Sequence, residues 1–260
     1  MGELIARRQF TPMYIWLDLA FLLFFAGLLL YKRKYMTVAV GAVFGVIYMV
    51  VDYGIFHLVC HSRSITGGNL FWVLLWMSMS YGFTNFAWIW LWISKNKDLL
   101  EWSILILLWW FCCPLLTQTF GGFWVPVVIQ RTTGSYHGYM AMLLFAGYLF
   151  LLVWNLAHSD KREKMPLLWL LAMGVLVQFG WEAGLLLGGI RSAGFDFLSS
   201  LRTLVIQSLL ETNLGMPYIF CIYLWYHSRW NEDLSKRETP VTFLESLREN
   251  NAMKVRGSHS

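Results

Sequence analysis

The chain is poor in charged residues. Only 13% of its 260 residues are charged and 58% are hydrophobic, whereas soluble domains carry about 25% charged residues. The connections between its apolar runs are short, so none of them can form a soluble catalytic domain. We therefore predict an integral membrane protein, in which the formal charge of +5 reflects membrane topology and does not indicate nucleic-acid binding.

Cysteine is also scarce, and its placement argues against disulfide or metal chemistry. The four cysteines lie within or beside apolar runs and form no CxxC motif, and in such surroundings cysteine behaves as a small hydrophobic residue. His57 and His61 lie at i and i+4 of a predicted helix, a spacing that can hold a transition metal. Because no Glu partner motif accompanies the pair, we favour His57 as a hydrogen-bonding neighbour of buried acids. We expect no metal and no cofactor.

Seven apolar runs are each long enough to cross a bilayer, which takes about 20 residues per helix. They cover residues 13–31, 36–59, 70–94, 100–122, 138–157, 166–188 and 203–227. We predict an all-α, polytopic membrane protein with one transmembrane domain over residues 1–230. A polar cytoplasmic tail follows over residues 231–260, and its final VRGSHS is typical of a vector-derived remnant.

Basic residues are unevenly distributed between the two sides of these runs. One side, with the connections after the first, third and fifth runs and the tail, holds Lys32, Arg33, Lys34, Lys95, Lys97, Lys161, Arg162, Lys164, Arg229, Lys236 and Arg237. The other side holds Arg7, Arg8, Arg63, Arg131, Arg191 and Arg202. The positive-inside rule then predicts a cytoplasmic C-terminus and an N-terminus outside.

An internal repeat emerges when the chain is aligned with itself at a shift of 128 residues. Residues 63–64 and 191–192 are then both Arg-Ser, and residues 84–85 and 212–213 are both Thr-Asn. The shift superimposes the first three runs on the last three and leaves the fourth as a connector. We interpret this pattern as a 3+1+3 parallel repeat.

Three carboxyl groups lie at a similar depth in the predicted spans. Asp52 and Glu182 precede Arg63 and Arg191 by eleven and nine residues, which corresponds to roughly 14–17 Å along a helix, and Glu211 enters from the same side. An ionised carboxylate in the bilayer costs at least about 2.5 kcal/mol, so each requires a partner or a wet cavity. We predict one shared polar chamber open to the exterior. The alternative is that each acid only bonds to polar neighbours where helices pack.

Several other residues near these acids are candidates for substrate binding. Trp181 directly precedes Glu182, and a ring against the carboxyl would exclude water and favour its neutral, proton-donating form. Aromatic walls also stabilise cations, by roughly 0.5–2 kcal/mol per ring. The arginines of the outer connections, Arg63, Arg131 and Arg191, can bind an anionic headgroup or serve as interfacial anchors.

With these features the chain resembles the small seven-helix integral-membrane terpene cyclases of meroterpenoid and indole-terpenoid biosynthesis. The shared features are the length, the short basic first connection YKRKYM, Asp52 in VVDYGIFH and Glu211 in the seventh run. That family tends to carry an aromatic residue followed by Glu in its second helix, whereas here the Trp-Glu pair falls at residues 181–182. The resemblance implies that Asp52 and Glu211 protonate an epoxide or alkene and assist termination of the cation. The DxDD and DDxxD motifs of soluble cyclases are absent.

The first function that follows is an intramembrane, metal-independent enzyme. It would cyclise a lipophilic, isoprenoid substrate by protonation, with Asp52, Glu182 and Glu211 as catalytic acids and membrane lipids as its surroundings. The residues expected to bind substrate are His57, Arg63, Asn85, Trp181, Arg191 and Asn213.

The second function is a small-solute transporter built on the repeat. Asp52, Asn85, Glu211 and Asn213 would then surround a binding site near the middle of the membrane. Proline is scarce, with six residues in the chain, and only the fourth and seventh runs are interrupted by it. Because alternating-access carriers usually contain broken helices, this scarcity favours the enzyme.

Overall fold

The computed structural model describes residues 6–131, 136–159, 164–191 and 197–230. The helices are α1 (Pro12–Tyr31), α2 (Tyr35–Met49), the π-helix η1 (Val50–Val59), α3 (Leu70–Ile93), α4 (Leu99–Phe120), α5 (His137–Ala157), α6 (Leu167–Leu187) and α7 (Phe197–Trp230). With η1 continuing α2, one helical segment falls on each predicted run. The predicted tail after residue 230 lies outside the described residues.

Five of these segments are long and apolar enough to cross a membrane. They are α1, the combined segment Tyr35–Val59, α4, α5 and α6. Helix α3 is instead the most enclosed: it contacts α1, α2, η1, α4, α6 and α7, and most of its residues are buried. Its polar side chains therefore face other helices and are not exposed to lipid.

Helices α2 and α3 pack closely because glycines face each other. A Cβ added to Gly82 of α3 would lie 2.8 Å from Cα of Gly45 on α2, and one added to Gly41 would lie 2.9 Å from the Phe83 ring. Small residues at such contacts let two backbones approach in a membrane protein. The tight α2–α3 contact fixes the start of η1, where Asp52 lies.

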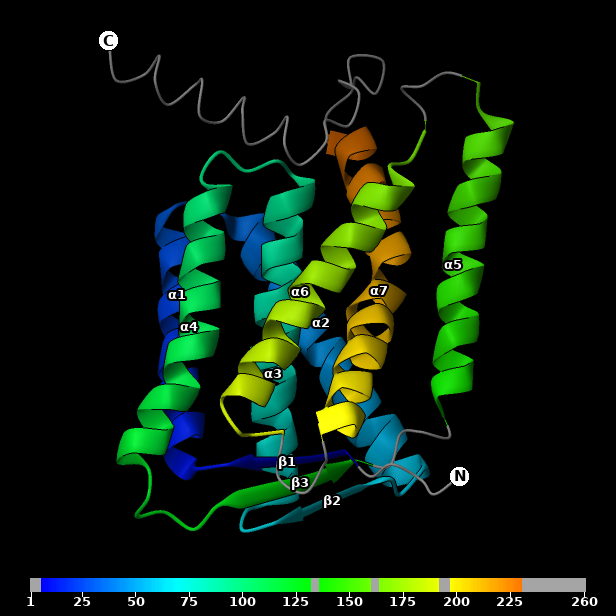
Figure 1. Ribbon diagram of the computed structural model, residues 1–260. Coiled ribbons are helices and arrows are strands. Elements are labelled where there is room, and N and C mark those ends of the chain that lie inside the picture. Colours follow the sequence, from blue (N-terminus) through cyan, green and yellow to red (C-terminus); the bar gives the residue numbers. More distant parts are fainter. Residues whose placement is uncertain (1–5, 132–135, 160–163, 192–196, 231–260) are drawn as a thin grey trace.

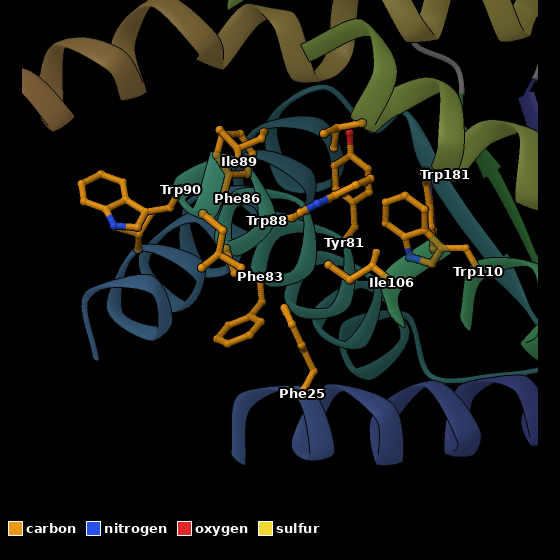
Figure 2. Close-up of a cluster of buried hydrophobic side chains, with 14 of the residues drawn as sticks. Phe25, Tyr81, Phe83, Phe86, Trp88, Ile89, Trp90, Ile106, Trp110 and Trp181 are labelled. Carbon is orange, nitrogen blue, oxygen red and sulfur yellow. The ribbon is translucent and has the colours of Figure 1, made fainter. Parts of the chain in front are cut away.

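Aromatic side chains fill the centre of the bundle (Figure 2). The Trp181 ring of α6 packs against Trp110 of α4 and Tyr81 of α3, with centroid distances of 5.5 and 5.9 Å. Most of the deep tryptophans are thus part of the protein core.

A small antiparallel sheet lies across one end of the bundle (Figure 1), and the sequence had not predicted it. Strand β3 (Val127–Arg131) is central, flanked by β1 (Ala6–Phe10) and β2 (Arg63–Thr66). In β1, Arg8 and Phe10 are buried, whereas Arg7 and Gln9 are exposed. This alternation is that of a strand with one face on the core. The sheet covers the end of the bundle that was expected to open to the exterior.

Candidate functional site

Asp52 binds two arginines that come from two different strands. Its Oδ1 accepts hydrogen bonds from Nε and Nη2 of Arg63, at 2.9 and 2.7 Å, and from Nη2 of Arg131 at 3.1 Å. The Arg63 guanidinium also lies 4.5 Å from the centre of the Phe56 ring. Asp52 is only 5% exposed, so this is a buried ion-pair cluster at the junction of η1 and the sheet.

Glu182 binds a second pair of arginines. Its Oε1 accepts hydrogen bonds from Nη2 of Arg8 at 3.1 Å and Nη2 of Arg191 at 2.6 Å, and Nε of Arg191 lies 2.5 Å from Oε2. The carboxylate has no solvent exposure. The Glu182 carboxylate faces guanidiniums, whereas the Trp181 ring that was expected to pack on it lies against Tyr81 and Trp110.

Gln178 connects Glu182 to the third acid. Its Nε2 donates to Oε1 of Glu182 at 3.3 Å and to Oε2 of Glu211 at 3.0 Å. Its Oε1 accepts from the Tyr81 hydroxyl and from Oγ1 of Thr212, the latter at 2.6 Å. Every polar group of this amide is therefore used, which fixes the orientation of the Glu211 carboxyl.

A pocket with a volume of about 180 Å³ lies between the helices and the arginines of the sheet. Both Asp52 and Glu211 line it, whereas Glu182 does not. Its remaining lining is Arg8, Phe44, Ile47, Tyr48, Val51, Phe56, Arg63, Met77, Ser78, Tyr81, Phe86, Arg131, His137, Met140, Leu214 and Gly215. The sequence predicted that three acids share one chamber. The structure places two of them in one pocket, and the third, Glu182, is linked to Glu211 through Gln178.

The predicted substrate-binding residues divide in the same way. Arg63 lines the pocket, whereas Arg191 is engaged with Glu182. His57, Asn85, Trp181 and Asn213 do not line it. The amide of Asn85 is fully buried with neither Nδ2 nor Oδ1 hydrogen-bonded, and the Asn213 side chain lies 3.3 Å from the Tyr148 hydroxyl. Within the described ranges, no group of three His, Cys, Asp or Glu could hold a metal around His57 or elsewhere.

Sequence reasoning missed four site residues: Arg8, Ser78, Tyr81 and Gln178. Two of them carried a signal. The alternation in the strand ARRQF places Arg8 on the same face as Phe10, and Gln178 lies one helical turn before Glu182, where side chains share a face. Ser78 and Tyr81 carried none, because α3 is buried on nearly all sides.

The three arginines of the pocket remain charged. Burial, reinforced by the nearby Arg191, lowers the pKa of Arg8 to about 10. Burial, reinforced by Arg131, likewise lowers the pKa of Arg63 to about 10. Burial also opposes the charge of Arg131, but Asp52 and Glu211 outweigh it and raise its pKa. The side of the pocket next to the sheet is therefore cationic at neutral pH.

Comparison with known proteins adds no family to this description. No family model matches the chain, and neither a curated protein nor a solved structure is significantly similar to it. The geometry of the pocket is therefore the basis for a functional proposal.

Proposed function

We propose that the protein is an intramembrane enzyme that cyclises a lipophilic, isoprenoid substrate, with Glu211 as the proton donor. The observation that supports this most directly is that Asp52 and Glu211 line one pocket but differ in their partners. The terpene-cyclase resemblance assigned both acids to catalysis. Their surroundings favour separate roles for them.

Glu211 is suited to donate and recover a proton. Among the described residues, it is the one acid of the three without an arginine in an ion pair, so its protonation breaks no ion pair. Gln178 donates to its Oε2, which leaves Oε1 to carry the proton. Transfer of that proton to an alkene or epoxide creates a carbocation. The resulting carboxylate then removes a proton from the carbon next to the final cation, so the reaction is a net isomerisation.

The apolar wall is suited to hold the cation. Phe44, Tyr48, Tyr81 and Phe86 line the pocket together with Glu211, and each aromatic face adds roughly 0.5–2 kcal/mol of attraction for a cation. Asp52 cannot serve in the same way, because its two arginines make that cluster net positive. Its role in this proposal is to hold Arg63 and Arg131 at the polar end of the pocket.

The finer topology belongs to the same proposal. All seven helices would cross the membrane, with the N-terminus outside, the C-terminus in the cytoplasm, and α1–α3 related to α5–α7 by duplication. In support, Asp52 pairs with Arg63 and Glu182 pairs with Arg191, and these two arginines coincide at the same shift that aligns the Thr-Asn pairs. The transporter alternative requires Asn85 and Asn213 beside the two acids, yet neither asparagine lines the pocket.

Product formation by membranes that carry the protein tests the proposal. An epoxy-farnesyl or epoxy-geranylgeranyl acceptor is incubated with the wild type and with Glu211→Gln. Because general acid catalysis contributes about 10²–10⁴-fold, Glu211→Gln should form product at least roughly 100-fold more slowly. Glu101→Gln, at an exposed position of α4, is the matched control. Undiminished product from Glu211→Gln would refute the role of the acid, and uptake of substrate into proteoliposomes without chemical change would favour transport.

A further inference from the structure

The cationic side of the pocket carries buried donors that have no acceptor. Oγ of Ser78, Nε of Arg8 and Nε of Arg131 are buried without a hydrogen-bond partner, and all three residues line the pocket. Ser78 and Arg8 are 2% and 3% exposed. Buried polar groups are nearly always hydrogen-bonded, and one that is left unsatisfied costs about 1–3 kcal/mol. Three such groups around one cavity indicate a ligand that supplies acceptor oxygens.

The charges of the pocket specify what kind of acceptor this is. Three guanidiniums, those of Arg8, Arg63 and Arg131, face two carboxyl groups, those of Asp52 and Glu211. When Glu211 carries the proton that the proposed reaction requires, Asp52 is the one charged carboxylate that lines the pocket, and Glu182 behind it pairs with both Arg8 and Arg191. Arg63 already donates hydrogen bonds from Nε and Nη2 to Asp52. Four guanidiniums thus share two carboxylates. Arg8 and Arg131 each donate from Nη2 to a carboxylate that a second arginine also binds, and the Nε atoms of both are without a partner.

The part of the lining that precedes Asp52 on α2 is apolar and reaches the surface of the bundle. Phe44 and Ile47 lie about two turns and one turn before Asp52, they line the pocket together with Phe86 and Leu214, and Ile47 is 44% exposed. Helix α2 is part of one of the segments able to cross a membrane. A hydrocarbon chain that leaves the pocket beside Ile47 would therefore enter lipid.

From this arrangement we infer that the pocket binds an anionic amphiphile, with a carboxylate or phosphate headgroup held by Arg8, Arg131 and Ser78 and its chain against Phe44 and Phe86. The inference rests on the proposed function, since it names the substrate class of the same pocket. It adds that the isoprenoid enters with its charged end toward the sheet. Charge-assisted hydrogen bonds to guanidiniums are stronger than neutral ones, so the headgroup, not the chain, sets selectivity.

Competitive binding tests the inference without any need for turnover. The purified full chain in neutral maltoside micelles is incubated with tritiated dodecanoate, and a scintillation proximity assay measures its displacement by dodecyl phosphate or by dodecanol. Dodecyl phosphate should compete at least roughly 10-fold better than dodecanol, because the alcohol cannot supply charged acceptors. Arg131→Gln and Ser78→Ala should reduce this preference, and Arg131→Lys should largely retain it. Arg7→Gln is the matched control, since Arg7 is exposed on the other face of the same sheet.

The outcomes separate this inference from the proposed function. Equal competition by dodecanol, or an unchanged preference in both Arg131→Gln and Ser78→Ala, would overturn the anion site and leave the Glu211→Gln test untouched. Full product formation by Glu211→Gln with intact anion preference would overturn the role of Glu211 as proton donor and leave the anion site standing.

A further competition experiment adds phosphatidylglycerol. If it displaces dodecanoate from the wild type, the anion site takes a bilayer lipid headgroup, and if it does not, the site takes a single-chain substrate.

Discussion

At the scale of residues, the partners of each carboxyl group decide what it can do. Asp52 and Glu182 each face two arginines, and Glu211 accepts from the amide of Gln178. Another acid of the bundle, Asp18, is buried and accepts from the indole nitrogens of two tryptophans, at 2.9 and 3.2 Å. These are chemically similar groups in one apolar bundle. In the proposed mechanism the proton donor is Glu211, the one of these four that has, within the described part of the chain, neither an arginine in an ion pair nor two indole donors.

The partners of Glu182 imply a structural role that mutation can test. In Glu182→Gln, the guanidiniums of Arg8 and Arg191 lose their counter-charge while they remain buried, and removal of one partner from a buried ion pair costs about 3–5 kcal/mol. Thermal unfolding in detergent should therefore occur at a clearly lower temperature than in the wild type. Glu101→Gln, at the exposed α4 position, should unfold like the wild type. Equal melting temperatures for Glu182→Gln and the wild type would contradict the structural role.

At the scale of elements, the site depends on two features of local geometry. The helix from Tyr35 changes to the π-form at Val50, and π-helical turns frequently occur at functional sites. The sheet then brings Arg8, from the segment before α1, to the pocket together with Arg63 and Arg131, from two connections between helices. The helices were predictable because each is a long apolar run. The strands have only four or five residues in polar connections, and their pairing is fixed by contacts between distant segments, so no local pattern identifies them.

The close α2–α3 packing gives a prediction at this scale. Gly82→Ala places a methyl group against the backbone of Gly45, so the helices must separate and η1 must move with α2. We expect a lower melting temperature and less product. The control is Gly27→Ala in α1, where an added Cβ meets nothing within 4 Å and helix propensity favours alanine by about 1 kcal/mol. If both variants unfold at the wild-type temperature, the α2–α3 contact is looser than described.

At the scale of the whole molecule, the proposed topology requires that α3 and α7 also cross the membrane. Both are long enough, with 24 and 34 residues, but neither is among the five segments that are also apolar enough to cross a membrane. Helix α3 is enclosed by its neighbours, so lipid contact does not constrain its sequence. Its crossing therefore has to be tested directly.

Labelling of single cysteines checks both the crossing of α3 and the orientation. With Cys60, Cys112, Cys113 and Cys221 replaced by alanine, Gln9→Cys and Lys97→Cys introduce thiols at exposed positions before α1 and after α3. A membrane-impermeant maleimide added to intact cells should label the first and not the second, because three spans separate them. Labelling of both would mean that α3 does not cross. Labelling of the second alone would reverse the orientation.

The sequence by itself determined that the chain is helical and apolar, where its helices lie, and that Asp52, Glu182 and Glu211 are the unusual groups within them. These properties follow from local composition, because a run of apolar residues forms a helix in lipid whatever its neighbours are. Only the tertiary structure decided which acid meets which arginine, that Gln178 joins two acids, and that a sheet closes the pocket. Ion pairing depends on the approach of residues far apart in the chain, and hydropathy along the chain carries no information about that approach.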